Sequence, residues 1–529
     1  MTIDDAESAF DKAAPPVDNR ALANCGQDDL GNSERLRERF GHDLRYTGGL
    51  GVHVFDGKRW KLDAQQHSAL RAAHKTVRAI VLESKALLAE ARECDDPEQK
   101  KALTEHAEAL RKWATTSANG NHLKAVLTHS WPYLTHPLEG WNAEPTLFNA
   151  QNGTLDLFSI EPQLRAHRRE DYLTHMANVA YDPDAQCREF RKFIDRVLPP
   201  ETMPEGVEDR SYQKFVQRCL GACLIDSVKD QALVVFHGGG ANGKSTLMNA
   251  VANVLGDYAM TVAVQSLLYS EQSGSSASPD VARLAERPRL VRVSEPEPGA
   301  KLSEGGVKSL TGGEPLVARK LHQEPIEFSP NFKIFLSCNN RPSIRGGDDG
   351  IWRRILLVAW RVQIPPEEQR EKGPALEVAL REEAPGILNW LVEGLQDYYE
   401  CGGLAPPPSV LSETLEYRTD SDVVGRFIGE CCDRGDLLEE DAGDLYEAFK
   451  LWAKEQGLSP KGPMTPTTFG KRLTDRGYSR RRSNGATFRQ GLELDSEWRA
   501  KLKEERRRTE NATADRESRR RGADLQDEE

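Results

Sequence analysis

The most informative segment of this chain is Leu233-Val-Val-Phe-His-Gly-Gly-Gly-Ala-Asn-Gly-Lys-Ser-Thr-Leu247. Its apolar run, Leu233–Phe236, is rich in β-branched and aromatic residues and breaks at a glycine cluster, which is typical of a buried strand that enters a tight loop. An amphipathic run follows over Thr246–Val254. The sequence therefore predicts a strand, a glycine-rich turn and a helix in that order.

The turn fits the phosphate-loop pattern G-x-x-x-x-G-K-[ST]. Backbone N–H groups of such a loop can wrap phosphate oxygens at a helix N-terminus. We expect the Lys244 ammonium to reach the β- and γ-phosphates and the Ser245 hydroxyl to bind Mg²⁺. The alternative is a turn that binds nothing, but the flanking strand and helix favour a nucleoside triphosphate site. The residues expected to form it are Gly238, Gly239, Gly240, Ala241, Asn242, Gly243, Lys244, Ser245 and Thr246.

Length and composition limit the other possibilities. With 529 residues the chain is too long for one core and suggests about three or four domains. A net charge of −12 excludes a uniformly basic surface, although not a local basic patch. Nine cysteines without paired C-x-x-C spacing predict reduced thiols. The sequence shows no signal peptide and no membrane-length apolar run, so we expect a soluble cytoplasmic protein without a membrane partner.

The region before the phosphate loop carries strong helix and turn signals. Residues 1–31 lack apolar periodicity and predict a flexible leader. A helix is predicted over Ser33–Phe40. Two long helices are predicted over Ala64–Ala118 with a break at Asp95–Pro97. The dipeptide Asn152-Gly153 predicts a hairpin.

Two strands after the phosphate loop are expected to end beside it. Arg289–Val293 is followed by Glu295 and Glu297, and Phe332–Ser337 is followed by Asn339. In a parallel sheet these ends share one edge, so the carboxylates could hold Mg²⁺ through water and polarise the attacking water. The Asn339 amide could contact the γ-phosphate or orient the water. A solvated acidic turn and an ordinary loop are the alternatives.

Leu316–Phe328 alternates on both sides of a polar tip and predicts a β-hairpin. Its tip carries Arg319, Lys320 and His322, a compact cationic group that could grip a phosphate backbone. A charged surface hairpin is the alternative.

Two adjacent arginines, Arg353 and Arg354, lie in a strand predicted over Ile351–Val358. On a strand they would point to opposite faces. One could be buried in a local ion pair while the other projects to the γ-phosphate of a neighbouring subunit as an arginine finger.

The C-terminal part outlines a winged helix. Helices after Phe427, a helix over Thr465–Leu473 and a hairpin over Tyr478–Leu492 are predicted. Basic residues crowd this region, so duplex DNA binding is expected, with a basic face on a protein-docking domain as the alternative. The residues expected to contact DNA are Lys471, Arg472, Arg480, Arg481 and Arg482.

The order of these motifs resembles the superfamily 3 helicases of phage and plasmid primase-helicases. The resemblance covers about residues 32–430 and rests on the phosphate loop, Ser294-Glu295, Lys308-Ser-Leu-Thr-Gly-Gly-Glu314, Asn339 and Asp348-Asp-Gly-Ile-Trp-Arg-Arg-Ile355. It implies an α/β fold with an AAA+-like core, a parallel central sheet and a mostly helical N-terminal region. It also implies a homo-hexameric ring that uses ATP and Mg²⁺ to move on single-stranded DNA and unwind the duplex.

By position, the resemblance assigns each motif a role. Lys244 and Ser245 become Walker A, Glu295 and Glu297 Walker B, and Asn339 sensor 1, while Pro298 stands where the family pattern has a further glutamate. Arg319, Lys320 and His322 match the DNA-contacting pore hairpin. Arg354 becomes the finger, with Arg353 as the fallback.

The expected domains follow from these assignments. They are a leader (1–31), an N-terminal helicase-associated region (32–195), the ATPase domain (196–364), a helical lid and linker (365–425), a winged-helix-like domain (426–495) and a charged tail, partly helical or disordered (496–529). We expect no primer synthesis by this chain, which would act with a separate primase or other replication proteins of a phage or mobile element in a bacterial host.

Two other functions fit part of the sequence. One is a P-loop ATPase that serves as a switch or nucleic-acid sensor without unwinding. The other is a DNA-binding adaptor with a degenerate site, against which the intact Lys244, Ser245 and Glu295 argue.

Overall fold

The chain forms two compact units, Met1–Glu413 and Thr414–Glu529. The second unit therefore begins inside the predicted lid and linker (365–425). Lys320 and His322 of the predicted hairpin tip lie outside the described residues, as does most of the predicted leader. The computed structural model describes residues 17–159, 161–202, 208–268, 279–297, 300–319, 325–344, 349–458, 464–483 and 485–524.

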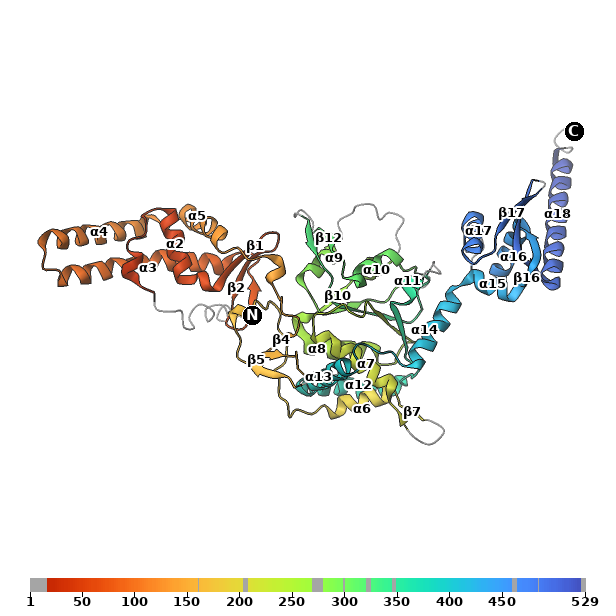
Figure 1. Ribbon diagram of the computed structural model, residues 1–529, viewed down its shortest axis with the longest axis horizontal. Coiled ribbons are helices and arrows are strands. Elements are labelled where there is room, and N and C mark those ends of the chain that lie inside the picture. The colour runs from red at the N-terminus through yellow and green to blue at the C-terminus, as the bar shows by residue number, and fades with distance from the viewer. Residues whose placement is uncertain are drawn as a thin grey trace. The chain divides into compact units, whose positions relative to one another are not determined.

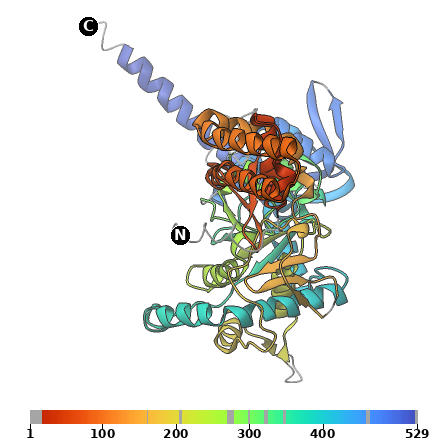
Figure 2. The ribbon, with the colours of Figure 1, turned by 90° about the vertical axis from the view of Figure 1, so that its left-hand side faces the viewer.

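A helical part opens the first unit. The two predicted long helices are present as α3 (His67–Glu93) and α4 (Pro97–Thr116), which run side by side in Figures 1 and 2. Proline at the start of α4 fits a first helical turn, where its missing N–H costs nothing. The other helices here are α1 (Asn19–Leu22), α2 (Asp29–Phe40) and α5 (Gly120–Ser130), with 3₁₀ turns η2 (Gly41–Asp43), η3 (Trp131–Tyr133) and η4 (Leu138–Gly140).

Regular secondary structure begins at Asn19, inside the segment that was predicted to be a flexible leader. The Asp18 carboxylate accepts hydrogen bonds from the backbone N–H groups of Arg20 and Ala21 and caps α1. Asp28 caps α2 in the same way, so that helix begins at Asp29 rather than at Ser33. The prediction was wrong because acidic residues favour loops and N-caps alike, and composition alone does not separate the two.

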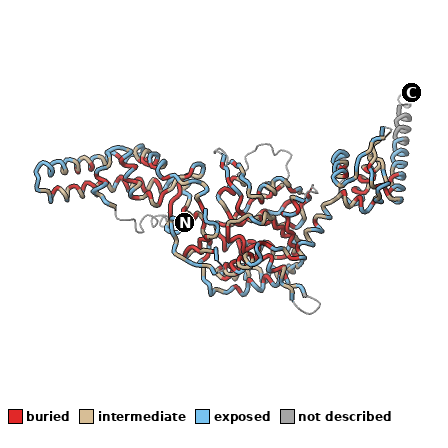
Figure 3. Tube along the Cα trace, in the orientation of Figure 1, coloured by how far each residue is buried: buried red, intermediate tan, exposed pale blue. Residues whose placement is uncertain are grey.

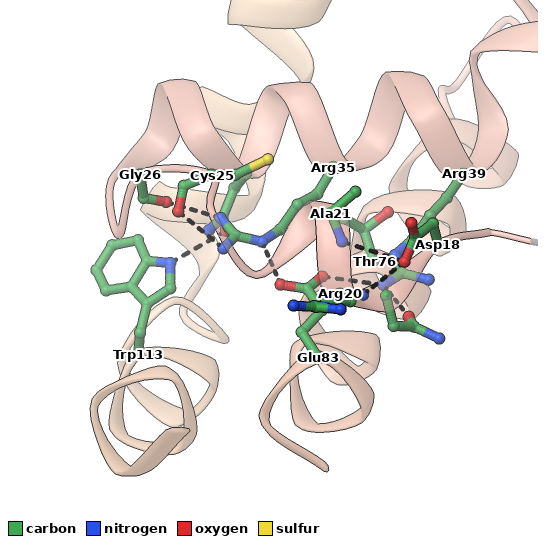
Figure 4. A network of polar contacts seen from close by, with 12 residues as sticks. Asp18, Arg20, Ala21, Cys25, Gly26, Arg35, Arg39, Thr76, Glu83 and Trp113 are labelled. Atoms are coloured by element: carbon green, nitrogen blue, oxygen red, sulfur yellow. Dashed lines mark hydrogen bonds and ion pairs between the residues drawn. The ribbon is translucent and has the colours of Figure 1, made fainter. Parts of the chain in front are cut away.

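A buried ion-pair network fastens α2 to α3 (Figure 4). Arg35 Nε donates to one carboxylate oxygen of Glu83 at 2.7 Å, and Arg39 Nη2 donates to the other at 2.9 Å. The side chains of Arg35 and Glu83 are both 0% exposed. Arg35 also donates to the carbonyls of Cys25 and Gly26. The Glu83 carboxylate thus balances the buried charge of this guanidinium, and the two carbonyls accept its further N–H groups.

Two small antiparallel sheets complete the N-terminal part. The predicted hairpin at Asn152-Gly153 is confirmed by the pairing of β4 with β5. Their strands are β1 (Leu44–Thr47), β2 (Gly51–Phe55) and β3 (Trp60–Leu62) in the first sheet, and β4 (Leu147–Ala150), β5 (Gly153–Asp156) and β6 (Gln163–Arg165) in the second, with η5 (Arg169–Asp171) after it.

A five-stranded parallel sheet forms the centre of the first unit, in the order β10-β11-β14-β9-β15. The predicted parallel central sheet is thus confirmed. The strand before the phosphate loop, β9, lies between β14 and β15. Its loop therefore emerges near the ends of β14 and β11. The bounds are β9 (Leu233–His237), β10 (Ala259–Val262), β11 (Leu290–Val293), β14 (Lys333–Cys338) and β15 (Ile355–Ala359).

The main core lies around this sheet, where Figure 3 shows the buried residues gathered. α7 (Ser211–Gly221) and α13 (Ala384–Glu400) pack closely because glycine faces backbone at their contact: a Cβ on Gly221 would lie 2.4 Å from the backbone N of Leu395. The other elements around the core are α6 (Arg188–Val197), β7 (Glu201–Thr202), β8 (Glu208–Asp209), η6 (Ala222–Leu224), α8 (Lys244–Leu255), η7 (Gly256–Tyr258), α12 (Pro366–Glu382) and α14 (Pro408–Ser421).

The segment between β10 and β15 carries the predicted hairpin. β12 (Leu316–Ala318) and β13 (Ile326–Phe328) pair antiparallel, which confirms it. The other elements there are η8 (Val264–Ser266), α9 (Pro279–Arg283), η9 (Leu284–Glu286), α10 (Glu304–Gly312) and α11 (Asp349–Trp352).

The strand predicted over Ile351–Val358 begins only at Ile355. Ile351 and Trp352 close α11, and Arg353 and Arg354 lie in the turn between that helix and β15. The prediction of two arginines on a strand was wrong, because the apolar run that suggested a strand is shared between a helix end and a strand start.

The second unit contains the predicted helices and C-terminal hairpin around an aromatic core that includes Phe427, Phe449, Trp452 and Phe469. Its sheet has the order β16-β18-β17. Strand β16 was not predicted, because its residues are mostly polar and acidic. Part of the predicted charged tail is ordered as a helix whose Trp498 and Leu502 join the core. The elements are α15 (Val423–Cys431), β16 (Cys432–Asp441), α16 (Ala442–Glu455), α17 (Pro466–Asp475), β17 (Arg480–Ser483), β18 (Ala486–Leu494) and α18 (Ser496–Asp524).

Candidate nucleotide-binding site

Two glycines of the phosphate loop are required by close packing. A Cβ on Gly238 would lie 2.3 Å from the carbonyl oxygen of Trp360. Gly243 has a φ of +86°, which favours glycine, and a Cβ there would lie 2.6 Å from Val197 Cγ1. Gly243 is also the N-cap residue of α8, so the loop turns directly into the helix N-terminus.

The loop borders a cavity of about 390 Å³ that is also lined by the ends of β11 and β14. The structure thus brings together groups from three strand ends, as predicted. Gly238, Gly239, Gly243 and Thr246 belong to the loop or to α8 without lining this cavity. The predicted residues that do line it are Gly240, Ala241, Asn242, Lys244, Ser245, Glu295 and Asn339.

Hydrogen bonds link the three central side chains of the cavity. Lys244 Nζ donates to Asn339 Oδ1 at 3.3 Å and to the Gly238 carbonyl at 2.5 Å. Asn339 in turn donates to both carboxylate oxygens of Glu295, from its backbone N at 2.8 Å and from Nδ2 at 3.1 Å. Burial lowers the pKa of the Lys244 ammonium below its ordinary value. We call this chain of contacts the Lys244–Asn339–Glu295 chain.

The cavity has donors suited to Mg²⁺ but no complete set of protein ligands. Ser245 and Glu295 both line it. Within the described ranges, no group of three or more His, Cys, Asp and Glu residues could hold a metal ion. Ser245 and Glu295 suit Mg²⁺, which proteins usually bind through one or two side chains together with substrate phosphates and water.

Glu297 is not brought to the cavity. Its side chain is exposed, and it does not appear among the lining residues. The buried Pro296 separates it from Glu295. Of the two predicted carboxylates, Glu295 alone lines the cavity.

The two predicted finger residues differ in exposure. Arg354 is 8% exposed and donates to the Gly350 carbonyl at 2.7 Å and to Gln231 Oε1 at 3.0 Å. Arg353 is exposed. Both precede β15, and the Arg354 carbonyl accepts from Leu233 N at the start of the parallel β9. They therefore lie at the amino-terminal end of the parallel strands, whereas the phosphate loop of the same chain lies at the carboxyl-terminal end.

Arg292 lines the cavity and was not predicted as a site residue. Its Nη1 donates to Asn249 Oδ1 at 2.8 Å and its Nη2 to Thr261 Oγ1 at 2.9 Å. Partial burial lowers its pKa. A charged residue in the middle of the apolar strand Leu290–Val293 was the signal available in the sequence.

The predicted DNA contacts are only partly accessible. Arg319 is exposed directly after β12. In the second unit, Lys471, Arg480 and Arg482 are exposed and Arg472 is half-buried. Arg481 donates from Nε to Glu439 at 2.9 Å, so part of its charge is already neutralised.

Comparison with known proteins finds one matching family model and several viral relatives. Residues 33–199 match the family described as D5 N terminal like. "Putative helicase L207/L206" of Acanthamoeba polyphaga mimivirus is 29% identical over 328 residues, which cover 58% of this chain and 33% of the relative. "Putative primase C962R" of African swine fever virus (isolate Tick/Malawi/Lil 20-1/1983) is 25% identical over 304 residues, which cover 55% of this chain and 31% of the relative. Over these regions the chain is thus similar to a D5-type domain and to putative helicases and primases of large DNA viruses.

The chain spans about a third of the length of these curated relatives. Among solved structures, the C-terminal region of NrS-1 covers 63% of this chain and 70% of its own, at 11% identity and a TM-score of 0.35, a likeness too slight to carry an argument. In the described part of the chain, no helix combines the length and apolar character that crossing a bilayer requires.

Proposed function

We propose that this chain is an ATP-dependent DNA helicase. The observation that carries the proposal is the Lys244–Asn339–Glu295 chain, which joins groups from three parallel strands in one cavity at a phosphate loop. The similarity to viral proteins named as putative helicases and primases supports the same role. We further propose an AAA+-like core, for which the strand order with β9 between β14 and β15 is the support.

The chain's own residues divide the work of hydrolysis. Lys244 would exchange its carbonyl contacts for phosphate oxygens, and the loop N–H groups would bind the others. Ser245 and Glu295 would hold Mg²⁺, which when bound neutralises charge that develops on the phosphates. Asn339 fixes both oxygens of the Glu295 carboxylate and so orients it toward the attacking water.

We assign the trans-acting finger to Arg353 rather than to the Arg354 first favoured. A finger has to reach a neighbouring subunit, and Arg353 is the exposed member of the pair. Arg354 is held by Gly350 and Gln231 and supports the turn instead. This assignment presupposes a ring, for which a homo-hexamer is our proposal.

DNA would be held at two places. Arg319, together with Lys320 and His322 of the predicted tip, would contact single-stranded DNA. We propose a winged-helix domain for the second unit, which its element order α15-β16-α16-α17-β17-β18 supports, and its exposed Lys471, Arg480 and Arg482 would contact duplex DNA. We also propose that the chain acts with a separate primase or other replication proteins, and that it serves a phage or plasmid in a bacterial host. The relatives named above are viral.

ATP hydrolysis by the full chain tests the site. Lys244→Ala should abolish hydrolysis, because the buried ammonium is the cation that faces the phosphates. Lys372→Ala is the matched control, since that side chain is 74% exposed on α12. Steady-state phosphate release with unchanged circular dichroism would separate loss of chemistry from loss of fold. Full activity in Lys244→Ala would contradict the assignment.

A further inference from the structure

A second cavity of about 660 Å³ adjoins the nucleotide cavity across β10. Thr261 lines both cavities. We call the second one the β10 cleft. Its walls come from β2 and β3, from the segment at Thr174-His175, and from η7, β10 and η9. Parts of the chain far apart in sequence therefore build it.

The walls are held together by fixed contacts. Arg59 on the N-terminal side forms an ion pair with Asp257 on the core side. The backbone N of Asp257 donates to the Met176 carbonyl at 3.2 Å. Arg287 donates to the Trp141 carbonyl at 3.1 Å. The cleft is therefore preformed, and its volume lies within the roughly 300–1,000 Å³ of ligand pockets in general.

The inner surface combines apolar and neutral polar groups. Leu50, Leu62, Leu138 and Met260 supply the apolar part. His53 is 4% exposed, and its Nδ1 has no hydrogen-bond partner of ordinary geometry within the described residues. Burial lowers the pKa of His53 to about 4, so its imidazole is neutral near pH 7 and can meet a planar polar ligand as donor or acceptor.

Cationic side chains also line the cleft. Arg59, Lys61, Arg283 and Arg287 oppose two acids, Asp257 and Glu286. Arg59 is paired with Asp257, and Arg287 with Asp226. Arg283 is exposed at the end of α9. A positive rim on a chain with a net charge of −12 favours an anionic ligand.

We propose that the β10 cleft binds a nucleotide, with its base against Leu62, Met260 and His53 and its phosphate near Lys61 and Arg283. The ligand is either a free nucleoside monophosphate or one nucleotide of a single DNA strand. A ligand in the cleft would lie next to the nucleotide cavity, because Thr261 lines both cavities. The Thr261 hydroxyl accepts a hydrogen bond from Arg292, which lines the nucleotide cavity. The proposal does not rest on ATP hydrolysis.

Calorimetric titration of the full chain tests the cleft. Lys244→Ala serves as the background, to weaken binding at the phosphate loop, and the probes are thymidine monophosphate and a short oligothymidylate. Arg283→Glu should remove the phosphate contact, and Leu62→Asn should weaken the base contact; Leu62 is 41% exposed, so the fold should tolerate the change. Each should weaken binding about fivefold. Arg370→Glu, at an exposed position on α12, is the matched control and should change nothing.

The two probes distinguish the sources of the ligand. Weaker binding of the monophosphate in both cleft variants supports a free-nucleotide site. Weaker binding of the oligothymidylate alone supports a nucleotide of a strand. If neither variant lowers the affinity for either probe relative to Arg370→Glu, or if neither probe binds saturably, the proposal is overturned.

Discussion

Among single residues, Asn339 links the other two central side chains of the proposed ATPase site. It accepts from Lys244 and donates twice to Glu295, so it touches the groups that the sequence assigned to Walker A and Walker B. Strand ends could be predicted from apolar runs and their polar termini. The direction of each hydrogen bond could not, because it depends on how three strands far apart in sequence align.

Asn339→Ala should reduce kcat for ATP hydrolysis about 10- to 100-fold with little change in KM. The variant loses the amide donor that helps to orient the Glu295 carboxylate, while the phosphate loop stays intact. Asn340→Ala, at the exposed neighbouring position, is the control. Equal rates in the two variants would remove Asn339 from the mechanism.

At the scale of elements, the buried network of Arg35, Arg39 and Glu83 sets how α2 meets α3 (Figure 4). Glu83→Gln should lower the free energy of unfolding by about 3–5 kcal/mol, because two guanidinium groups would lose the buried charge that balances them. Chemical denaturation measures this difference.

Glu90→Gln provides the comparison. Glu90 pairs with Arg20, whose side chain is 66% exposed, and such a pair contributes about 0–1 kcal/mol. If both variants lost the same stability, the buried network would not carry the packing of α2 on α3.

Elements with a strong period were predictable and those without one were not. α3 and α4 follow from their helical period and the break before Pro97, and β9 and α8 follow from the phosphate loop. β16 was missed because its residues are polar, and its pairing with β18 comes from tertiary contact. The turn at Arg353 was missed because one apolar run spans two elements.

At the scale of the whole molecule, the proposal requires more than one copy of the chain. The phosphate loop and the turn at Arg353 and Arg354 lie at opposite ends of the parallel strands. A single chain therefore cannot bring both to one nucleotide. In a ring, one subunit would supply the loop and its neighbour the arginine.

Mixed rings test this arrangement. Arg353→Ala subunits mixed with wild-type subunits should reduce hydrolysis at neighbouring wild-type sites, giving less activity than the wild-type fraction alone predicts. Phosphate release measured across mixing ratios shows the effect as a curve below the straight line. A linear dependence would reject Arg353 as a trans finger, and the same series with Arg354→Ala would show whether the buried arginine has that role.

The most direct test of the account is unwinding of a forked DNA duplex by the full chain with ATP and Mg²⁺, with electron microscopy of the same particles. We predict strand separation by ring-shaped particles of the wild-type chain and none by Lys244→Ala. Rapid ATP hydrolysis without strand separation and without rings would contradict the account and identify the chain as an ATPase switch.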